Sequence, residues 1–312
     1  TSGHEEIGLT SLSTGDYTEF VPLADELLDR YSKDKISISL PSLRIDAFSL
    51  DLMDRVQAVR KSGLTFAPEA GTQRLRDVIN KGITEEEILN GCGLAFAGGW
   101  TRVKLYFMVG LPTETEEDLQ GIVDLANKIC EKFFEIPKED RKNKQISVVV
   151  SSACFVPKPF TPFQWEPQST VQEFFDKQKY VKTHMTRKQV RYNYHEPELS
   201  SLEGVLARGD RKTSKLLYRA WELGCKFDGW NDIFDYSKWM QAFEDTGLSK
   251  EFYANRRRND EVLPWDHISI GVSKKFFINE MEKAKQEIVT KNCRTECANC
   301  GAKCFGGGVC FE

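Results

Sequence analysis

The strongest constraint on the fold of this 312-residue chain is a repeated alternation of strand-like and helix-like segments over its first half. Strand-like runs, rich in apolar and β-branched residues, lie at 6–12, 35–40, 64–68, 101–110 and 144–157. Segments with apolar residues at helical spacing follow the first four of them, at 19–32, 49–63, 84–99 and 115–133. Such alternation predicts an α/β fold with parallel strands.

Helix-boundary signals support this interpretation. Ser49 precedes the second helical segment and Gly63 follows it, as expected of an N-cap and a C-terminal stop. Thr84 opens the third, with Glu87 placed to complete a capping box.

Polar loops follow the predicted strands, at 13–17, 41–46, 68–72, 110–115 and 156–163. In βα barrels, the active site is built from the loops at the carboxyl ends of the strands. Glu69 directly follows a strand in the sequence "PEAGT". Its carboxylate could bind hydroxyl or amino groups of a ligand, or it could cap the next helix, and the spacing favours neither alternative.

The second half of the chain has mixed charge and a helical pattern. One basic stretch, "HMTRKQVRYNYH" at 184–195, interleaves cations with tyrosines, a combination that suits single-stranded nucleic acid. The net charge of −4 favours a solvated helix end instead. Arg256–Arg258 is a weaker basic feature, and a structural role is favoured for His195 over that of a base or ligand.

Five of the nine cysteines lie in the last 20 residues of the chain. Their density and spacing predict a metal centre with ligands Cys293, Cys297, Cys300 and Cys304, and with Cys310 as a possible replacement. Four thiolates suit either zinc or a 4Fe–4S cluster, and both alternatives stay open, with a slight preference for iron–sulfur. Cys92, Cys130, Cys154 and Cys225 stand among apolar neighbours and are expected to be buried.

Metal-like cysteine spacing favours a reducing compartment over a disulfide framework, so we expect a cytoplasmic protein. No apolar run is long enough to span a bilayer, so no membrane partner is expected.

Two runs, "GLTFAPEAGTQRLRDVINKGITEEEIL" and "GWTRVKLYFMVGLPTETEEDLQGI", resemble the core of radical S-adenosylmethionine (SAM) enzymes, near the methylthiotransferases and cobalamin-dependent members. "EEIGLTSLSTGDY", "YHEPELSSLEGVLARGDRK", "GCKFDGWNDIFDY" and "LPWDHISIGVSKKF" resemble a functionally uncharacterised bacterial family, in which a cobalamin-binding-like domain precedes the radical SAM barrel. The resemblance implies a partial (β/α)6 TIM-like barrel at 1–165, beginning at its second strand. A helical region at 166–290 and a Cys-rich metal-binding tail at 291–312 would follow.

Radical SAM barrels hold their catalytic 4Fe–4S cluster with a CxxxCxxC loop after the first strand. No CxxxCxxC occurs here before Cys293. The resemblance therefore implies that the chain is a C-terminal fragment, inactive alone, with the catalytic cluster ligands upstream. It identifies no catalytic side chain.

The resemblance also implies a set of SAM-binding residues. The loop after the barrel's second strand would bind the SAM amino group, with Asp16 in place of a more usual glutamate. The next loop would reach the carboxylate or ribose, Glu69 the ribose or methionine end, and the turn after 109 the adenine. The residues, in chain order, are Thr14, Gly15, Asp16, Ser39, Ser42, Arg44, Glu69, Val109, Gly110, Leu111 and Pro112.

The implied activity is reductive cleavage of SAM to a 5′-deoxyadenosyl radical that acts on an unknown substrate, with RNA as one candidate. Flavodoxin or ferredoxin would supply the electron, and cobalamin is a further candidate cofactor. The alternative is a non-catalytic RNA- or ribosome-binding protein with a degenerate barrel and a zinc knuckle. A barrel hydrolase is disfavoured, because no loop offers paired carboxylates or a histidine metal set.

Overall fold

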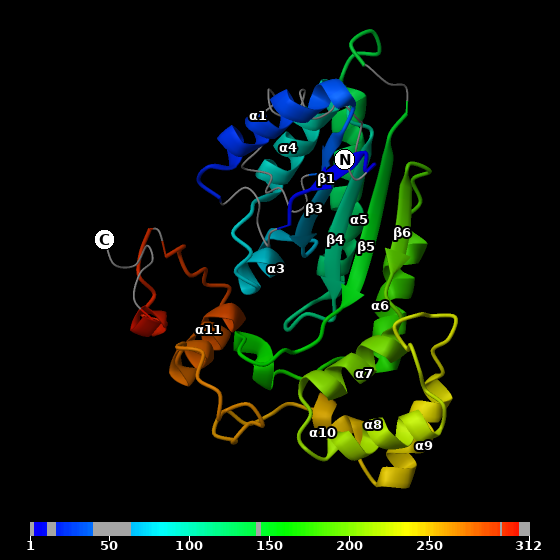
Figure 1. Cartoon of the computed structure of the whole chain (residues 1–312), viewed down its shortest axis with the longest axis vertical. Coiled ribbons are helices and arrows are strands. Elements are labelled where there is room, and N and C mark those ends of the chain that lie inside the picture. Colours follow the sequence, from blue (N-terminus) through cyan, green and yellow to red (C-terminus); the bar gives the residue numbers. More distant parts are fainter. Residues whose placement is uncertain (1–2, 11–16, 40–63, 142–144, 294, 306–312) are drawn as a thin grey trace.

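The computed structural model describes residues 3–10, 17–39, 64–141, 145–293 and 295–305 (Figure 1). Its main element is a four-stranded parallel sheet with the strand order β3-β4-β5-β6. The strands are β3 (Leu64–Glu69), β4 (Arg102–Val109), β5 (Ser147–Cys154) and β6 (Val190–Tyr194). The predicted α/β class and the parallel strands are confirmed, and the arrangement is consistent with a partial radical SAM TIM-like barrel.

Two short strands near the N-terminus form a separate parallel pair. These are β1 (Glu6–Gly8) and β2 (Ser37–Ser39), connected through α1 (Phe20–Tyr31) and the 3-10 turn η2 (Ser32–Asp34). Phe20, Ala24 and Leu28 bury the apolar face of α1 with Ile38 of β2. The helix predicted at 49–63 lies outside the described residues.

One face of the main sheet is covered by α4 (Glu85–Gly98), α5 (Glu116–Glu135) and α6 (Val171–His184). The alternation along β4 shows why, because Val103, Leu105, Phe107 and Val109 are buried in the core that these helices share. Lys104 and Tyr106 point to the opposite face and are more exposed. The sheet is therefore apolar and buried on the side that faces the helices.

The capping signals read from the sequence are confirmed at α4. The Thr84 side chain accepts from the Glu87 amide at 3.2 Å, and the Glu87 carboxylate accepts from the Thr84 amide at 2.7 Å. The helix ends at Gly99, whose φ of 100° is accessible to glycine at little steric cost.

The segment from 166 to 290 is not wholly helical, and this corrects the sequence analysis. Five residues of the basic stretch, Val190–Tyr194, form β6, which extends the sheet beyond β5. The Tyr192 hydroxyl hydrogen-bonds to that of Ser152 at 2.6 Å, so it anchors the added strand. The stretch thus begins at His184, the end of α6, and passes into β6 through a turn that contains Arg187 and Lys188. Arg187 pairs with Glu131. The division of the chain at 165 and 290 stays a prediction.

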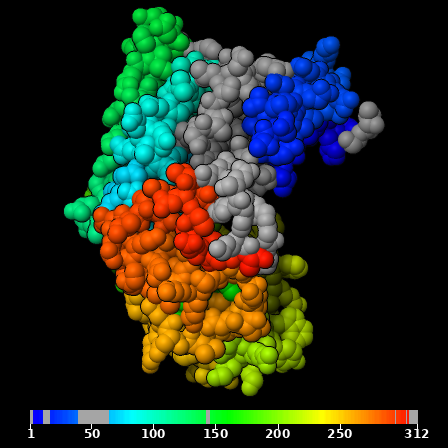
Figure 2. Space-filling view, turned by 90° about the vertical axis from the view of Figure 1, so that its left-hand side faces the viewer, coloured from blue at the N-terminus to red at the C-terminus, as the bar shows by residue number. Residues whose placement is uncertain are grey.

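Further helices follow β6 at the carboxyl edge of the sheet, where α7 and α11 lie beyond the strand ends (Figure 1). They are α7 (Pro197–Ala207), α8 (Thr213–Glu222), α9 (Tyr236–Thr246), α10 (Lys250–Ala254) and α11 (Lys274–Lys285). A second core joins α7 to α10, including Leu216, Trp239 and Tyr253. Figure 2 shows α11 and the segment after it, in orange and red, directly below the helices of the sheet region. Among the described residues, we find no helix with the length and apolar character needed to span a bilayer.

Candidate functional site

Glu69, the last residue of β3, has an unusual backbone conformation at the carboxyl edge of the sheet. Its φ is 66°, and the register between β3 and β4 shifts between Phe66 and Glu69. Such a conformation is unfavourable by about 1–3 kcal/mol for a non-glycine residue, and residues of this kind cluster at functional sites. The half-buried carboxylate pairs with Lys81 at 3.1 Å.

The helix-capping alternative for Glu69 is wrong. The N-cap of α3 (Gln73–Val78) is Thr72, whose hydroxyl accepts from the Leu75 amide at 3.2 Å. Glu69 is thus free of a capping role, and its carboxylate stands where a bound ligand could be recognised.

The turn after β4 contains the predicted residues Val109, Gly110, Leu111 and Pro112. The Val109 carbonyl accepts from the Phe155 amide at 2.8 Å, and the Gly110 amide donates to both carboxylate oxygens of Glu114 at 3.0 Å. These two backbone groups are therefore satisfied within the chain. A ligand at this turn would have to use other atoms of the four residues, and their role in binding adenine stays a prediction.

Gly110 is required at this turn for two reasons. Its φ is 82°, and a Cβ at this position would lie 2.4 Å from the ring of Phe174. The absence of a side chain thus lets α6 pack against the end of β4.

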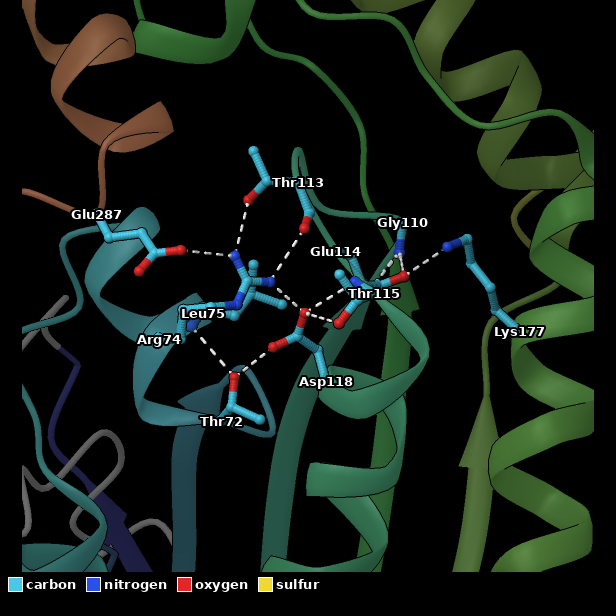
Figure 3. A network of polar contacts seen from close by, with 10 residues as sticks. All are labelled: Thr72, Arg74, Leu75, Gly110, Thr113, Glu114, Thr115, Asp118, Lys177 and Glu287. Carbon is cyan, nitrogen blue, oxygen red and sulfur yellow. Dashed lines mark hydrogen bonds and ion pairs between the residues drawn. The ribbon is translucent and has the colours of Figure 1, made fainter.

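Glu114 is a buried acidic residue that the sequence analysis missed. Only 2% of its side chain is exposed, and it pairs with Lys177 of α6 at 2.7 Å (Figure 3). Burial raises the pKa of Glu114, although Lys177 and the Gly110 amide act in the opposite direction. The available signal was a carboxylate four residues after the strand-end glycine in "GLPTE".

Asp118, in the first turn of α5, is the centre of a second polar network (Figure 3). Its side chain is 1% exposed and accepts from the Thr115 amide at 2.8 Å and the Thr115 hydroxyl at 3.0 Å. It also accepts from the Thr72 hydroxyl and from Arg74. Burial alone would raise the pKa of Asp118, but these hydrogen bonds hold it below its ordinary value.

Arg74 connects this network to the C-terminal part of the chain. Besides Asp118, its guanidinium donates to the Thr113 carbonyl at 3.0 Å and to Glu287 at 3.2 Å (Figure 3). The Thr290 amide donates to the side chain of Asn80 at 3.0 Å. The residues after α11 are thereby held against α3 and the turn after β4.

Close backbone contact reinforces the same junction. A Cβ on Gly71 would lie 2.3 Å from the Asp118 carbonyl oxygen and 2.4 Å from the Ile122 nitrogen. Any side chain here would push α5 away from the loop between β3 and α3. The glycine of "PEAGT" is therefore a packing requirement.

A cavity of about 230 Å³ opens where α3, the strand ends and α11 meet. Its walls are mainly apolar, and one of them is formed by Leu111, a predicted cofactor-binding residue. The lining residues are Asp77, Val78, Ile79, Asn80, Met108, Leu111, Phe155, Thr161, Pro162, Phe163, Glu280, Ala284 and Ile288. An apolar cavity with a few polar groups is typical of a small-molecule site.

Most of the other predicted SAM-binding residues cannot be placed. Thr14, Gly15, Asp16, Ser42 and Arg44 lie outside the described residues. Ser39 ends β2, where it is paired in register with Gly8. These assignments stay predictions.

The described part of the Cys-rich tail does not assemble a metal centre. Cys293, Cys297 and Cys304 are exposed and Cys300 is half-buried. No three histidine, cysteine, aspartate or glutamate side chains converge on a metal-sized site anywhere in the described residues. The described residues therefore show no preformed four-thiolate centre, and metal binding there stays a prediction.

The tail is nevertheless seated against the body of the chain. The Cys300 carbonyl accepts from the Ser273 amide at 2.9 Å. A Cβ on Gly301, whose φ is 103°, would lie 2.7 Å from the Gly271 carbonyl oxygen. The 3-10 turn η5 (Ala302–Phe305) follows.

The scattered cysteines are buried, as predicted. Burial raises the pKa of Cys92 to about 12, and burial is the leading cause that raises that of Cys130 and of Cys154 to about 11. Because the thiolate is the reactive form, these thiols are structural rather than nucleophilic.

The triple arginine at 256–258 is neutralised within the chain. Arg256 makes two hydrogen bonds to Glu166, at 2.7 and 2.5 Å. Arg257 pairs with Glu261, and Arg258 with Asp260, each at 2.6 Å. These cations are therefore not a free basic surface.

Comparison with known proteins now bears on the site. Residues 2–126 match the radical SAM superfamily, a span that includes Glu69, Glu114 and Asp118. An uncharacterized protein of Methanocaldococcus jannaschii is 34% identical over 245 residues, which are 78% of this chain and 50% of the relative. The chain thus spans about half the length of that relative. The chain contains a radical SAM superfamily domain at residues 2–126.

Proposed function

We propose that this protein is a radical SAM enzyme, which cleaves SAM reductively and acts on a substrate for which RNA is a candidate. The observation that carries the proposal is the coincidence of the superfamily match with the carboxyl-edge site. The match spans the loops that carry Glu69 and the turn after β4. In barrels of this type the reacting groups meet at that edge.

The residues at the carboxyl edge fit the two ends of SAM in different ways. The half-buried Glu69 carboxylate can accept hydrogen bonds from ribose hydroxyls or an ammonium group. The apolar cavity beside Leu111 suits a flat ring such as adenine. SAM bound to a reduced 4Fe–4S cluster would supply a 5′-deoxyadenosyl radical for hydrogen abstraction. The tail thiols as described do not provide that cluster's ligands.

The other residues of the site position these two features. Lys81 restrains the Glu69 carboxylate, and Glu114 holds the turn after β4 through the Gly110 amide. Asp118 and Arg74 hold α5, α3 and the C-terminal segment together. In our proposal this packing excludes water from the carboxyl edge, which strengthens each electrostatic contact to the ligand.

SAM titration into anaerobically reconstituted protein tests the proposal. We expect saturable binding that Glu69→Gln weakens and Glu86→Gln leaves unchanged, because Glu86 is an exposed residue of α4. Protein that carries an assembled cluster and still shows no saturable SAM binding would contradict it. RNA binding in such a preparation would then favour the non-catalytic alternative.

A further inference from the structure

The solvent face of α8 carries an aromatic pair next to cations. Leu216 and Ala220 are buried and attach the helix to the core of α7–α10. Lys215, Tyr218 and Trp221 stand on the opposite side of the helix, as the helical period of 3.6 residues requires. The polar and aromatic side chains of α8 thus share one outward face.

The two rings on this face are unusually exposed for their size. Tyr218 is 62% exposed and Trp221 is 56% exposed, with ring centroids 5.7 Å apart. The turn after the helix adds Phe227 and Trp230, which are also exposed. The Trp230 amide donates to the Phe227 carbonyl at 3.0 Å, which fixes that turn. Exposed aromatic side chains gathered in one short segment of the chain are typical of a binding site.

Four cations lie on α8 or in the segments directly before and after it. Arg211, Lys212, Lys215 and Lys226 make no ion pair with any carboxylate of the described residues. Glu222, on the same side of α8, is paired with Arg219 at 3.0 Å. The triple arginine at 256–258, in contrast, is fully paired. Positive charge without a carboxylate partner among the described residues is therefore present on and beside α8.

We propose that this surface binds single-stranded RNA. The α8 surface consists of Arg211, Lys212, Lys215, Tyr218, Trp221, Lys226, Phe227 and Trp230. Its unpaired cations are complementary to phosphates, and its rings can stack on unpaired bases. Both features are needed at once by a single strand, whereas a duplex keeps its bases stacked inside. We assign the bound strand to RNA because the loops and ends of RNA present unstacked bases.

The proposal does not depend on the SAM chemistry. It uses a part of the chain outside the superfamily match, and a surface other than the basic stretch at 184–195, part of which forms β6. A protein interface is the competing use of exposed aromatic residues, but the unpaired cations disfavour it, because charged residues are depleted in interface cores.

Fluorescence anisotropy with a labelled 12-nucleotide RNA tests the proposal on the whole chain. Each of Tyr218→Ala and Trp221→Ala should weaken binding by about 5- to 100-fold, the range for loss of one stacked base. Lys215→Glu should weaken binding and reduce the slope of log affinity against log salt by at least about 0.7, the value for one phosphate contact on a single strand. Tyr17→Ala and Lys179→Glu are matched controls, since both residues are exposed and lie outside the surface.

The variants remove exposed side chains, so circular dichroism should show unchanged folding. Weaker binding to duplex RNA and to DNA of the same sequence is the expected companion result. Tighter binding to DNA than to RNA would overturn the assignment to RNA. Variants that bind RNA as tightly as the wild type would overturn the assignment of RNA binding to the α8 surface. A protein that binds no RNA, but self-associates with rising concentration unless it carries Trp221→Ala, would also overturn it.

Discussion

Asp118→Ala should destabilise the protein strongly, because it removes the acceptor on which three segments converge. The Thr115 amide and the Thr72 hydroxyl would lose their acceptor, and Arg74 would lose its buried carboxylate. Breaking a buried pair reduces stability by roughly 3–5 kcal/mol. Arg74 is 31% exposed, so water would partly solvate the remaining guanidinium, and we expect a loss at the lower limit, about 3 kcal/mol.

Urea unfolding followed by circular dichroism at neutral pH measures this loss. Glu86→Ala, on the exposed side of α4, is the control and should stay within about 0.5 kcal/mol of the wild type. The measurement also has a pH signature. The folded-state pKa of Asp118 is depressed, so its contribution is present above the unfolded pKa of about 3.9. That contribution is lost as the pH falls through the folded-state value.

The difference in unfolding free energy between the wild type and Asp118→Asn should therefore shrink on acidification below about pH 4. Two results would refute the reasoning. One is an Asp118→Ala protein as stable as Glu86→Ala. The other is a difference that is independent of pH down to the acid limit of folding.

Three further predictions concern cofactors. In the reconstituted full-length protein, Glu69→Ala should weaken SAM binding by roughly 10- to 100-fold, through loss of a hydrogen bond to a charged group, and more than His195→Ala does. Calorimetry showing equal affinities for the wild type and Glu69→Ala would remove Glu69 from the site. The 312-residue chain should form no 5′-deoxyadenosine after reconstitution and dithionite reduction, because no CxxxCxxC precedes Cys293. Substantial formation of 5′-deoxyadenosine would identify the tail cysteines as the ligands of the catalytic cluster. The anaerobically purified chain should bind a metal through the four tail thiolates, with an affinity that falls at acid pH. Analysis of iron, sulfide and zinc distinguishes a cluster of about four irons from a site with about one zinc. A metal-free chain that behaves like its cysteine-to-alanine variant would exclude both metals.

The local architecture could be predicted from sequence patterns alone. The alternation of strands and helices, the capping box at Thr84 and the stop at Gly99 depend on residues within one or two turns of each other. The strand-end position of Glu69 likewise follows from local pattern. Such signals can be read along the chain because each describes contacts between near neighbours.

Only the tertiary structure decided which distant residues meet. The partners of Asp118 and Glu114 lie 44 and 63 residues away, and Glu287 meets Arg74 across 213 residues. Strand β6 has only five residues, and it forms a strand because β5 offers it a hydrogen-bonding edge. The exposed face of α8 could not be recognised from its spacing, since a helical pattern alone does not show which side the rest of the chain leaves uncovered. Long-range packing and pairing, which have no local signature, therefore assigned these residues their places.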